Sequence, residues 1–155
     1  MSTFTEIVTT YKEQFEAFQA KIAAEGKNQL AMVFSSFFAE NPTVEAIRWE
    51  QYAPHFNDGD ACEFSAHEPS YKFVGKDDIG YNEDGWVDGW SLQSDADYAI
   101  RQRAEDGIPE SIRPSCALLF EGLQAAEQAM KVVFGDDSQV TATREGFEIE
   151  EFDHD

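Results

Sequence analysis

The chain has 155 residues, of which 42% are hydrophobic and 14% are aromatic, and this is enough apolar material to form one packed core. Its 31 Asp and Glu residues outnumber its 11 Lys and Arg residues, and the formal net charge is −20. Such a charge excludes direct binding to nucleic acid or to an anionic membrane, and the aromatic content excludes a disordered acidic tail. We therefore expect a single domain over residues 1–155.

Two cysteines, Cys62 and Cys116, are too few for a disulfide framework. The first residues lack the basic and apolar regions of a secretory leader, and no window approaches eighteen consecutive apolar residues. We therefore expect a cytoplasmic protein with reduced thiols and no membrane span.

The first forty residues predict two helices. Thr3-Phe4-Thr5-Glu6 fits a capping box at the start of the first helix, and Gly26 stands where a helix often ends on a left-handed residue. Asn28 is suited to cap a second, more apolar helix over residues 30–39, which Asn41-Pro42 ends. We expect the apolar stripe of the first helix to pack in the core rather than against a partner helix. That stripe consists of Phe4, Ile7, Val8, Tyr11, Phe15, Phe18 and Ile22.

Residues 49–64 read WEQYAPHFNDGDACEF and predict a β-hairpin. Asn57-Asp58-Gly59 supplies residues that tolerate a positive φ at the turn, and aromatic residues flank the turn on both sides. Pro54 cannot donate to a strand ladder, so the first strand must end near it or lie at an edge of the sheet. In the returning strand, Cys62, Phe64 and Ala66 are expected to face one way.

The hairpin segment follows the pattern W-x-Q-Y-x-P-x-F-N-D-G-D-x-C-x-F, and residues 140–150 read VTATREGFEIE. Both segments resemble small acidic proteins encoded by bacteriophages and prophages. The resemblance covers a minor part of the chain and implies a phage origin. It implies no particular activity and transfers no catalytic residue.

Residues 71–74 predict a third strand, and residues 75–92 after it predict a long acidic loop with four glycines. A long loop in a compact domain is uncommon unless it is functional or mobile, so we take this one as the candidate partner-binding site. The alternative is a solvated loop whose tryptophans fold back on the core. The candidate residues are Asp77, Asp78, Glu83, Asp84 and Asp88, with Trp86 and Trp90 as aromatic anchors.

Two more helices are predicted after this loop. Ser94 or Asp95 can cap the first, which Gly107 stops. Pro114 is suited to the first turn of the second, which Gly135 ends. The second of these helices carries an apolar stripe made of Leu118, Leu119, Leu123, Ala126, Met130 and Val133.

The C-terminal tail predicts a second hairpin, in which residues 140–143 pair with residues 147–152 across Arg144-Glu145-Gly146. With this hairpin the chain holds about four helices and four or five strands of the hairpin type. The fold class we predict is therefore α+β, with an antiparallel sheet of hairpins packed against about four helices.

The acidic residues are not spread evenly along the chain. Residues 1–48 hold six acids and four bases, a net charge of −2. Residues 49–100 hold twelve acids and two bases, a net charge of −10, and residues 101–155 hold thirteen acids and five bases, a net charge of −8. A surface charged only for solubility has no reason to spare the first third. We therefore expect the sheet and its loops to form the charged face.

No metal-binding motif stands out. If Gly85 takes the sixth position of an EF-hand loop, Gly80 falls at the first position and Ser91 at the twelfth, where that motif needs acidic ligands. The polar residues around the first hairpin match no known zinc spacing. These residues are His55, Asp58, Asp60, Cys62 and His67.

The two thiols are also poor candidates for nucleophilic catalysis. Cys62 has His67 nearby, but the two lie on opposite faces of an alternating strand. Cys116 lies near a predicted helix start, where we expect a buried and inert thiol. We expect no catalytic residue, no bound metal and no cofactor.

The charge favours a non-enzymatic, phage-type inhibitor or modulator, present as a monomer or dimer in the host cytoplasm. It would bind a basic, nucleic-acid-binding surface of a host protein by imitating the charge of nucleic acid. One alternative is a structural or assembly protein that self-associates through the aromatic hairpins. Another is a small metal-dependent or thiol enzyme around His55, Cys62 and His67.

Overall fold

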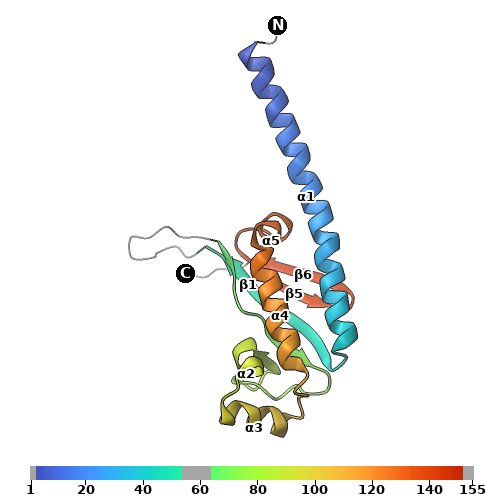
Figure 1. Cartoon of the computed structure of the whole chain (residues 1–155), viewed down its shortest axis with the longest axis vertical. Coiled ribbons are helices and arrows are strands. Elements are labelled where there is room, and N and C mark those ends of the chain that lie inside the picture. Colours follow the sequence, from blue (N-terminus) through green and yellow to red (C-terminus); the bar gives the residue numbers. More distant parts are fainter. Residues whose placement is uncertain (1–2, 54–63, 152–155) are drawn as a thin grey trace, which may run out of the picture.

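The computed structural model describes residues 3–53 and 64–151, and these residues form an α+β fold, which confirms the predicted class (Figure 1). The helices are α1 (Phe4–Glu40), α2 (Gly89–Gln93), α3 (Asp97–Asp106), α4 (Ile112–Ala125) and α5 (Glu127–Phe134). The strands are β1 (Val44–Tyr52), β2 (Ser65–Ala66), β3 (Ser70–Phe73), β4 (Trp86–Asp88), β5 (Ser138–Thr143) and β6 (Gly146–Glu151).

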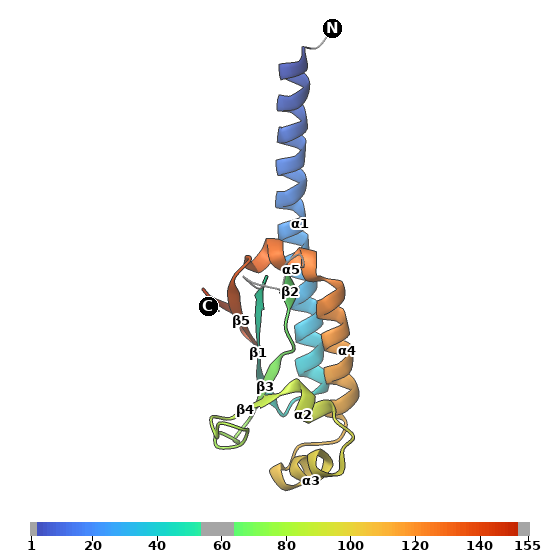
Figure 2. The ribbon, with the colours of Figure 1, turned by 90° about the vertical axis from the view of Figure 1, so that its left-hand side faces the viewer.

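The strands form one antiparallel sheet in the order β4-β3-β1-β5-β6, with the short β2 paired to β1. The helices α1, α4 and α5 lie on one side of this sheet (Figure 2). In the part of the chain that the structure describes, no helix covers the other side, which we call the open face. The open face carries Arg48, Glu50, Ser70, Lys72, Trp86, Asp88, Gln139, Thr141, Glu148 and Glu150.

The central strand β1 shows why the two faces differ. Its side chains alternate, so that Ile47, Trp49 and Gln51 are buried beneath the helices while Arg48 and Glu50 are half-buried on the open face. The strand ends at Tyr52, two residues before Pro54, as the missing donor of that proline predicts. An antiparallel sheet of this kind has one face packed against the core and one face exposed to solvent.

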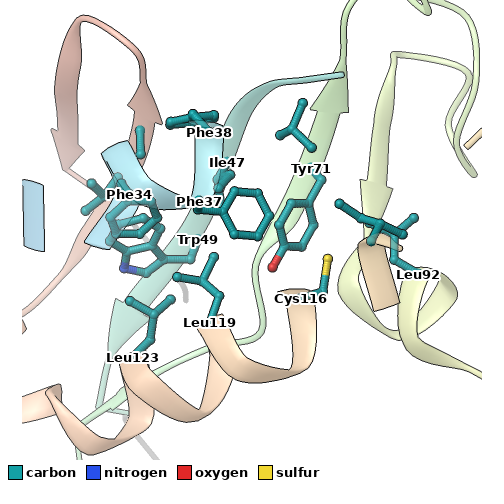
Figure 3. Close-up of a cluster of buried hydrophobic side chains, with 14 of the residues drawn as sticks. Phe34, Phe37, Phe38, Ile47, Trp49, Tyr71, Leu92, Cys116, Leu119 and Leu123 are labelled. Carbon is teal, nitrogen blue, oxygen red and sulfur yellow. The ribbon is translucent and has the colours of Figure 1, made fainter. Parts of the chain in front are cut away.

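The core is built around aromatic rings from four elements. Phe34 of α1 stacks on Trp49 of β1 with ring centroids 5.3 Å apart, and Phe134 of α5 meets the same Trp49 edge-on at 5.8 Å. Phe147 of β6 contacts both phenylalanines, at 5.5 Å and 5.0 Å. Leu119 and Leu123 of α4 extend this core toward the sheet (Figure 3). Packed aromatic pairs of this geometry stabilise a core beyond their buried area.

The first forty residues form one helix, so the prediction of two helices is wrong. Gly26 lies inside α1 and is buried where α5 crosses it. A Cβ atom at Gly26 would stand 3.4 Å from Val133 Cγ2 and 3.6 Å from Ala129 Cβ, so the glycine permits close helix packing. An isolated glycine costs a helix only about 1 kcal/mol, which the packing offsets.

The prediction that the apolar stripe at the start of α1 packs in the core is also wrong, because this stripe does not reach the core. From Thr3 to Glu25 no residue is buried, and Phe4 and Tyr11 are 81% and 66% exposed. This half of α1 projects beyond every other element (Figure 1). The core needs only the second half of α1, which supplies Leu30, Phe34, Phe37 and Phe38. The predicted cap at the helix start is confirmed, since the Thr3 hydroxyl accepts from the Glu6 amide at 3.2 Å.

The C-terminal end of α1 is fixed by Arg144, which lies in the turn between β5 and β6. Its guanidinium donates to the carbonyl of Phe38 in the last turn of α1 at 3.4 Å and to the carbonyls of Pro42 at 3.2 Å and Val44 at 2.9 Å just after the helix, and it lies 5.1 Å from the centre of the Phe38 ring. The carbonyls near a helix end lack partners within the helix, so this side chain joins the end of α1 to the last hairpin.

The segment predicted as one helix from Pro114 to Gly135 is two helices, α4 and α5, that meet at Ala126. The chain turns there because Ala126 leaves helical geometry, with φ −99° and ψ 14°. The turn brings Met130 into the core, while Leu118 of the predicted stripe is 70% exposed. The position of Pro114 in the first turn of α4 is confirmed.

The hairpin predictions are confirmed where the structure describes them. β5 and β6 pair from Ser138↔Glu151 to Thr143↔Gly146, and β1 pairs with β2 through Gln51↔Ala66. The turn of the first hairpin, residues 54–63, lies outside the described residues. The third predicted strand is β3, and Gly107 ends α3 in a left-handed conformation with φ 73°.

A first prediction concerns Gln51, which is fully buried between β1 and α5. Its amide oxygen accepts from Trp49 Nε1 at 3.0 Å, and its amide nitrogen donates to the carbonyls of Met130 at 3.0 Å and Gly135 at 2.7 Å. Gln51→Leu leaves these groups without partners, so we expect the free energy of unfolding in urea to fall by about 2–4 kcal/mol. Gln139→Leu on the open face is the control, with an expected change within about 0.5 kcal/mol. Equal stability of the two variants would contradict the role of Gln51.

Candidate functional site

The acidic segment after β3 is a compact turn rather than the long loop that the sequence predicts. Residues 75–85 connect β3 to β4, and Gly75, Gly80 and Gly85 all have positive φ. Hydrogen bonds from Glu83 N to Gly80 O (3.1 Å) and from Gly85 N to Ile79 O (2.8 Å) close the segment on itself. A Cβ atom at Gly80 would collide with the carbonyl of Trp86, so only glycine fits this position. We call residues 75–85 the acidic loop.

The rest of the predicted loop is regular structure. Trp86 to Asp88 form β4 at the edge of the sheet, and Gly89 to Gln93 form α2. Asp88 caps α2, because its carboxylate accepts from the Ser91 amide at 3.0 Å and from the Ser91 hydroxyl at 2.7 Å. The sequence signal for this helix start is Asp88, a residue type common at helix N-termini, three positions before Ser91.

Three of the five candidate carboxylates are free to meet a partner. Asp77, Asp78 and Glu83 are exposed, and the structure shows no hydrogen bond or ion pair for their side chains among the described residues. Glu83 has a left-handed backbone with φ 56°, which places it at a sharp turn of the acidic loop. The other two have local roles, since Asp84 accepts from the Trp86 amide at 3.1 Å and Asp88 caps α2.

The two candidate tryptophans do not lie together. Trp86 is half-buried on the open face, and the guanidinium carbon of Arg48 lies 4.2 Å from its ring centre. Trp90 is 52% exposed on α2, with its ring centre 6.0 Å from that of Tyr98. Trp86 therefore shares a surface with Asp88, whereas Trp90 faces α3. Both belong to the predicted site, whose role in binding stays a prediction.

The strand registers extend the acidic surface across the open face. One cross-strand row runs from Glu148 through Thr141, Arg48 and Ser70 to Asp88, since each is directly opposite the next. A second row joins Glu150, Gln139 and Glu50. Directly opposed residues in an antiparallel sheet point to the same face. The fold therefore brings acids of β1, β4 and β6 onto one surface, which the sequence could not show for Glu50, Glu148 and Glu150.

The acidic loop lies on the same side of the sheet as the open face, away from α1 and α4 (Figure 2). The open face also carries two basic side chains, Arg48 over Trp86 and Lys72 on β3. Near Asp88, partial burial of Glu68 and, to a smaller extent, the Asp88 carboxylate raise the pKa of the Glu68 carboxyl. The acidic loop and the open-face acids together are the candidate site.

Of the thiols and histidines considered from the sequence, the structure describes Cys116 and His67. Burial raises the pKa of the Cys116 thiol to about 12, so this residue is a neutral thiol at ordinary pH. It is fully buried, and the Tyr71 hydroxyl points toward its sulfur (Figure 3). His67 stacks on Tyr52 with ring centroids 4.2 Å apart. His55 and Cys62 lie outside the described residues.

Within residues 3–53 and 64–151, the structure holds no group of three or more His, Cys, Asp or Glu side chains placed to bind one metal ion. None of the helices described is long and apolar enough to cross a bilayer. Comparison with protein-family models, curated proteins and solved structures finds no match to this chain. The surface chemistry of the chain is therefore the basis for assigning a function.

A second prediction separates the structural role of Asp88 from its charge. Asp88→Ala removes the cap of α2, and we expect it to lower the free energy of unfolding by about 1 kcal/mol. Asp88→Asn keeps an oxygen that can accept from the Ser91 amide, so its stability should stay within a few tenths of a kcal/mol of the parent. Urea titration of both variants tests this. Equal losses in the two variants would show that the negative charge, not the cap, is what α2 needs.

Proposed function

We propose that this protein is a non-enzymatic, phage-type inhibitor or modulator that acts in the host cytoplasm. Its partner is a host protein with a basic, nucleic-acid-binding surface, which it engages by presenting carboxylates in place of phosphates. Carboxylates offer the negative charge and the hydrogen-bond acceptors that Lys and Arg side chains recognise in a phosphate backbone.

The observation that supports this proposal most strongly is the continuity of the candidate site. Asp77, Asp78 and Glu83 have no polar partner among the described residues, and the acidic loop that carries them lies on the same side of the sheet as the open face. Asp88 joins the two parts, since it follows the acidic loop along the chain and is the last residue of the row that begins at Glu148. The acceptor oxygens of unpartnered carboxylates are available to an external cation.

The rigidity of this surface favours binding. The acidic loop is closed by its own hydrogen bonds, and the open-face acids are fixed by strand pairing. A rigid display of charge avoids the entropy that a disordered acidic tail loses when it is ordered by a partner. The field of many like charges also speeds the encounter with a basic surface.

Trp86 is a second feature of the same surface that favours binding of a partner protein. Its ring is packed by the guanidinium of Arg48 at 4.2 Å, so the side chain is held in place beside Asp88. Aromatic side chains held in this way are common anchors in protein interfaces. A basic partner side chain that meets Asp88 would lie close to this ring, where a cation is also attracted.

A third prediction tests the acidic loop directly. The partner is first captured from a bacterial lysate, identified and purified, and its dissociation constant is measured by calorimetry. A variant with Asp77, Asp78, Asp84 and Asp88 changed to Asn and Glu83 changed to Gln removes five charges and keeps an acceptor oxygen at Asp84 for the Trp86 amide and at Asp88 for the cap of α2. We expect binding to weaken at least tenfold, about 1.4 kcal/mol, while the stability of the fold is retained.

The matched control removes five exposed charges from the helices: Glu13, Glu16, Glu40, Glu105 and Glu121 are changed to Gln. A companion variant changes the open-face residues Glu50, Glu148 and Glu150 to Gln. Weaker binding in the companion and not in the control would extend the site across the open face. If the control weakens binding as much as the loop variant, only net charge matters. If no variant weakens binding, imitation of nucleic acid is wrong.

A fourth prediction concerns ionic strength. Exposed charges act over about 30 Å at 0.01 M salt and about 8 Å at 0.15 M, so affinity for the partner should fall steeply over this range. The dependence of the logarithm of affinity on the logarithm of salt should be shallower for the five-charge loop variant than for the parent protein. Affinity that is constant across this range would indicate an apolar interface instead.

A further inference from the structure

The projecting half of α1 presents an ordered apolar surface that the described part of the chain does not cover. Four of its exposed side chains are aromatic, with exposures of 81% for Phe4, 66% for Tyr11, 49% for Phe15 and 58% for Phe18. Tyr11 and Phe15 stack on each other, with ring centroids 6.3 Å apart. Isolated exposed apolar residues are ordinary, but a continuous set along one helix marks an interaction surface.

The spacing of this surface is that of a coiled coil. Its six apolar positions, from Phe4 to Ile22, follow one another at steps of four, three, four, three and four residues. This alternation keeps one row of side chains facing a partner helix. The next two positions at these steps are the polar residues Glu25 and Gln29, so the apolar seam ends where the body begins. We call the six apolar positions the exposed seam: Phe4, Val8, Tyr11, Phe15, Phe18 and Ile22.

The exposed seam supplies most of the area that a stable pair needs. An aromatic side chain buries about 150–250 Å² when it is covered completely, so the four partly exposed rings offer roughly 400–600 Å². A stable interface needs about 800 Å² from each partner. Val8, which is 37% exposed, and the flanking Ile7, which is 57% exposed, add to the aromatic area.

The projecting helix also needs a partner for its own stability. Isolated helices are marginal in water, and this segment has Thr9 and Thr10 together with several aromatic residues, which are weaker helix formers than alanine. The described part of the chain buries no residue of its first five turns, from Thr3 to Lys21, which project beyond the other described elements. A second helix along the exposed seam would supply the missing packing.

We propose that the exposed seam binds the same seam of a second copy of this chain, in an antiparallel helix pair. The spacing reads the same from both ends, so a two-fold axis near residue 13 aligns every position. Each layer then holds one residue from each copy: Phe4 meets Ile22, Val8 meets Phe18 and Tyr11 meets Phe15. A self-complementary surface of this kind closes as a dimer, without unpaired positions that would recruit more copies.

Charge selects the antiparallel orientation. Residues 4–25 hold four acids and two bases, a net charge of −2, so the remaining residues of the chain carry −18. A parallel pair would place the two acidic bodies side by side, whereas an antiparallel pair places them at opposite ends of a helix about 33 Å long. None of the six positions that flank the exposed seam is acidic: these are Thr5, Ile7, Lys12, Gln14, Gln19 and Lys21.

The first test is the mass of the full chain in solution by light scattering and sedimentation. We expect about 35 kDa, twice the 17.5 kDa of one chain. The variant Tyr11→Ser/Phe15→Ser should raise the dissociation constant of the dimer at least about 100-fold and lower the helical signal in circular dichroism. Leu118→Ser removes an exposed apolar side chain from the body and should leave the dimer intact.

Three results would overturn the proposal: a monomer for the unchanged chain at micromolar concentration, a dimer that survives the seam variant, or an assembly larger than two. The near-ultraviolet signal of the buried Trp49 checks that the body of the seam variant is folded. Because mass is measured without any partner protein, this test fails or succeeds independently of the proposed function.

A second test fixes the orientation by disulfide cross-linking in a Cys62→Ser background. The antiparallel register places Val8 of one copy against Phe18 of the other. A mixture of the Val8→Cys and Phe18→Cys chains should therefore cross-link under mild oxidation, while each chain alone should not. Cross-linking of each chain alone would show a parallel pair and overturn the antiparallel arrangement.

Discussion

The stacking of Phe34 on Trp49 is the contact on which the rest of the molecule depends. It joins α1 to the central strand, and through Phe134 and Phe147 the same cluster holds α5 and the edge strand β6. Gln51, two residues along β1, ties α5 to the same place by hydrogen bonds. Because all of this packing uses one face of the sheet, the other face is left to solvent and to polar side chains. The open face is thus a consequence of where the aromatic rings lie.

Much of this fold could be predicted from the sequence because its signals are local. Two-residue alternation and turn residues define a strand and its hairpin over a few positions, and β1, β3, β5 and β6 were predicted in this way. The C-terminal end of α3 could be predicted for the same reason, since Gly107 adopts the left-handed conformation that often ends a helix. The predicted start is wrong, because the N-cap of α3 is Ala96 rather than Ser94 or Asp95. The exposure of the acidic side chains in the acidic loop could also be predicted, because charged residues are rarely buried.

Apart from the start of α2, which the local pair Asp88 and Ser91 defines, the errors involve contacts between distant residues. Gly26 has the same local sequence signal whether it ends a helix or admits Val133 and Ala129 against one, and only the position of α5 decides. The stripe from Phe4 to Ile22 has the period of a core helix, and nothing local shows that the core is already complete without it. The acids at Glu50, Glu148 and Glu150 could not be joined to the acidic loop, because only strand register places them on one surface. The break between α4 and α5 at Ala126 likewise depends on contacts between distant residues.

The distribution of charge limits how this protein can associate with itself. A body that carries most of the net charge repels a second body, and the exposed edge of β6 bears Glu148, Glu150 and Glu151, which oppose strand pairing between copies. Assembly through the hairpins is therefore disfavoured by the same acids that favour a basic partner. The projecting half of α1 is different, because its apolar side chains lie at the greatest distance from the acidic loop and its flanks carry no acid (Figure 1). Apolar contact at one end and charged contact at the other can operate together, since at physiological salt exposed charges act over only about 8 Å.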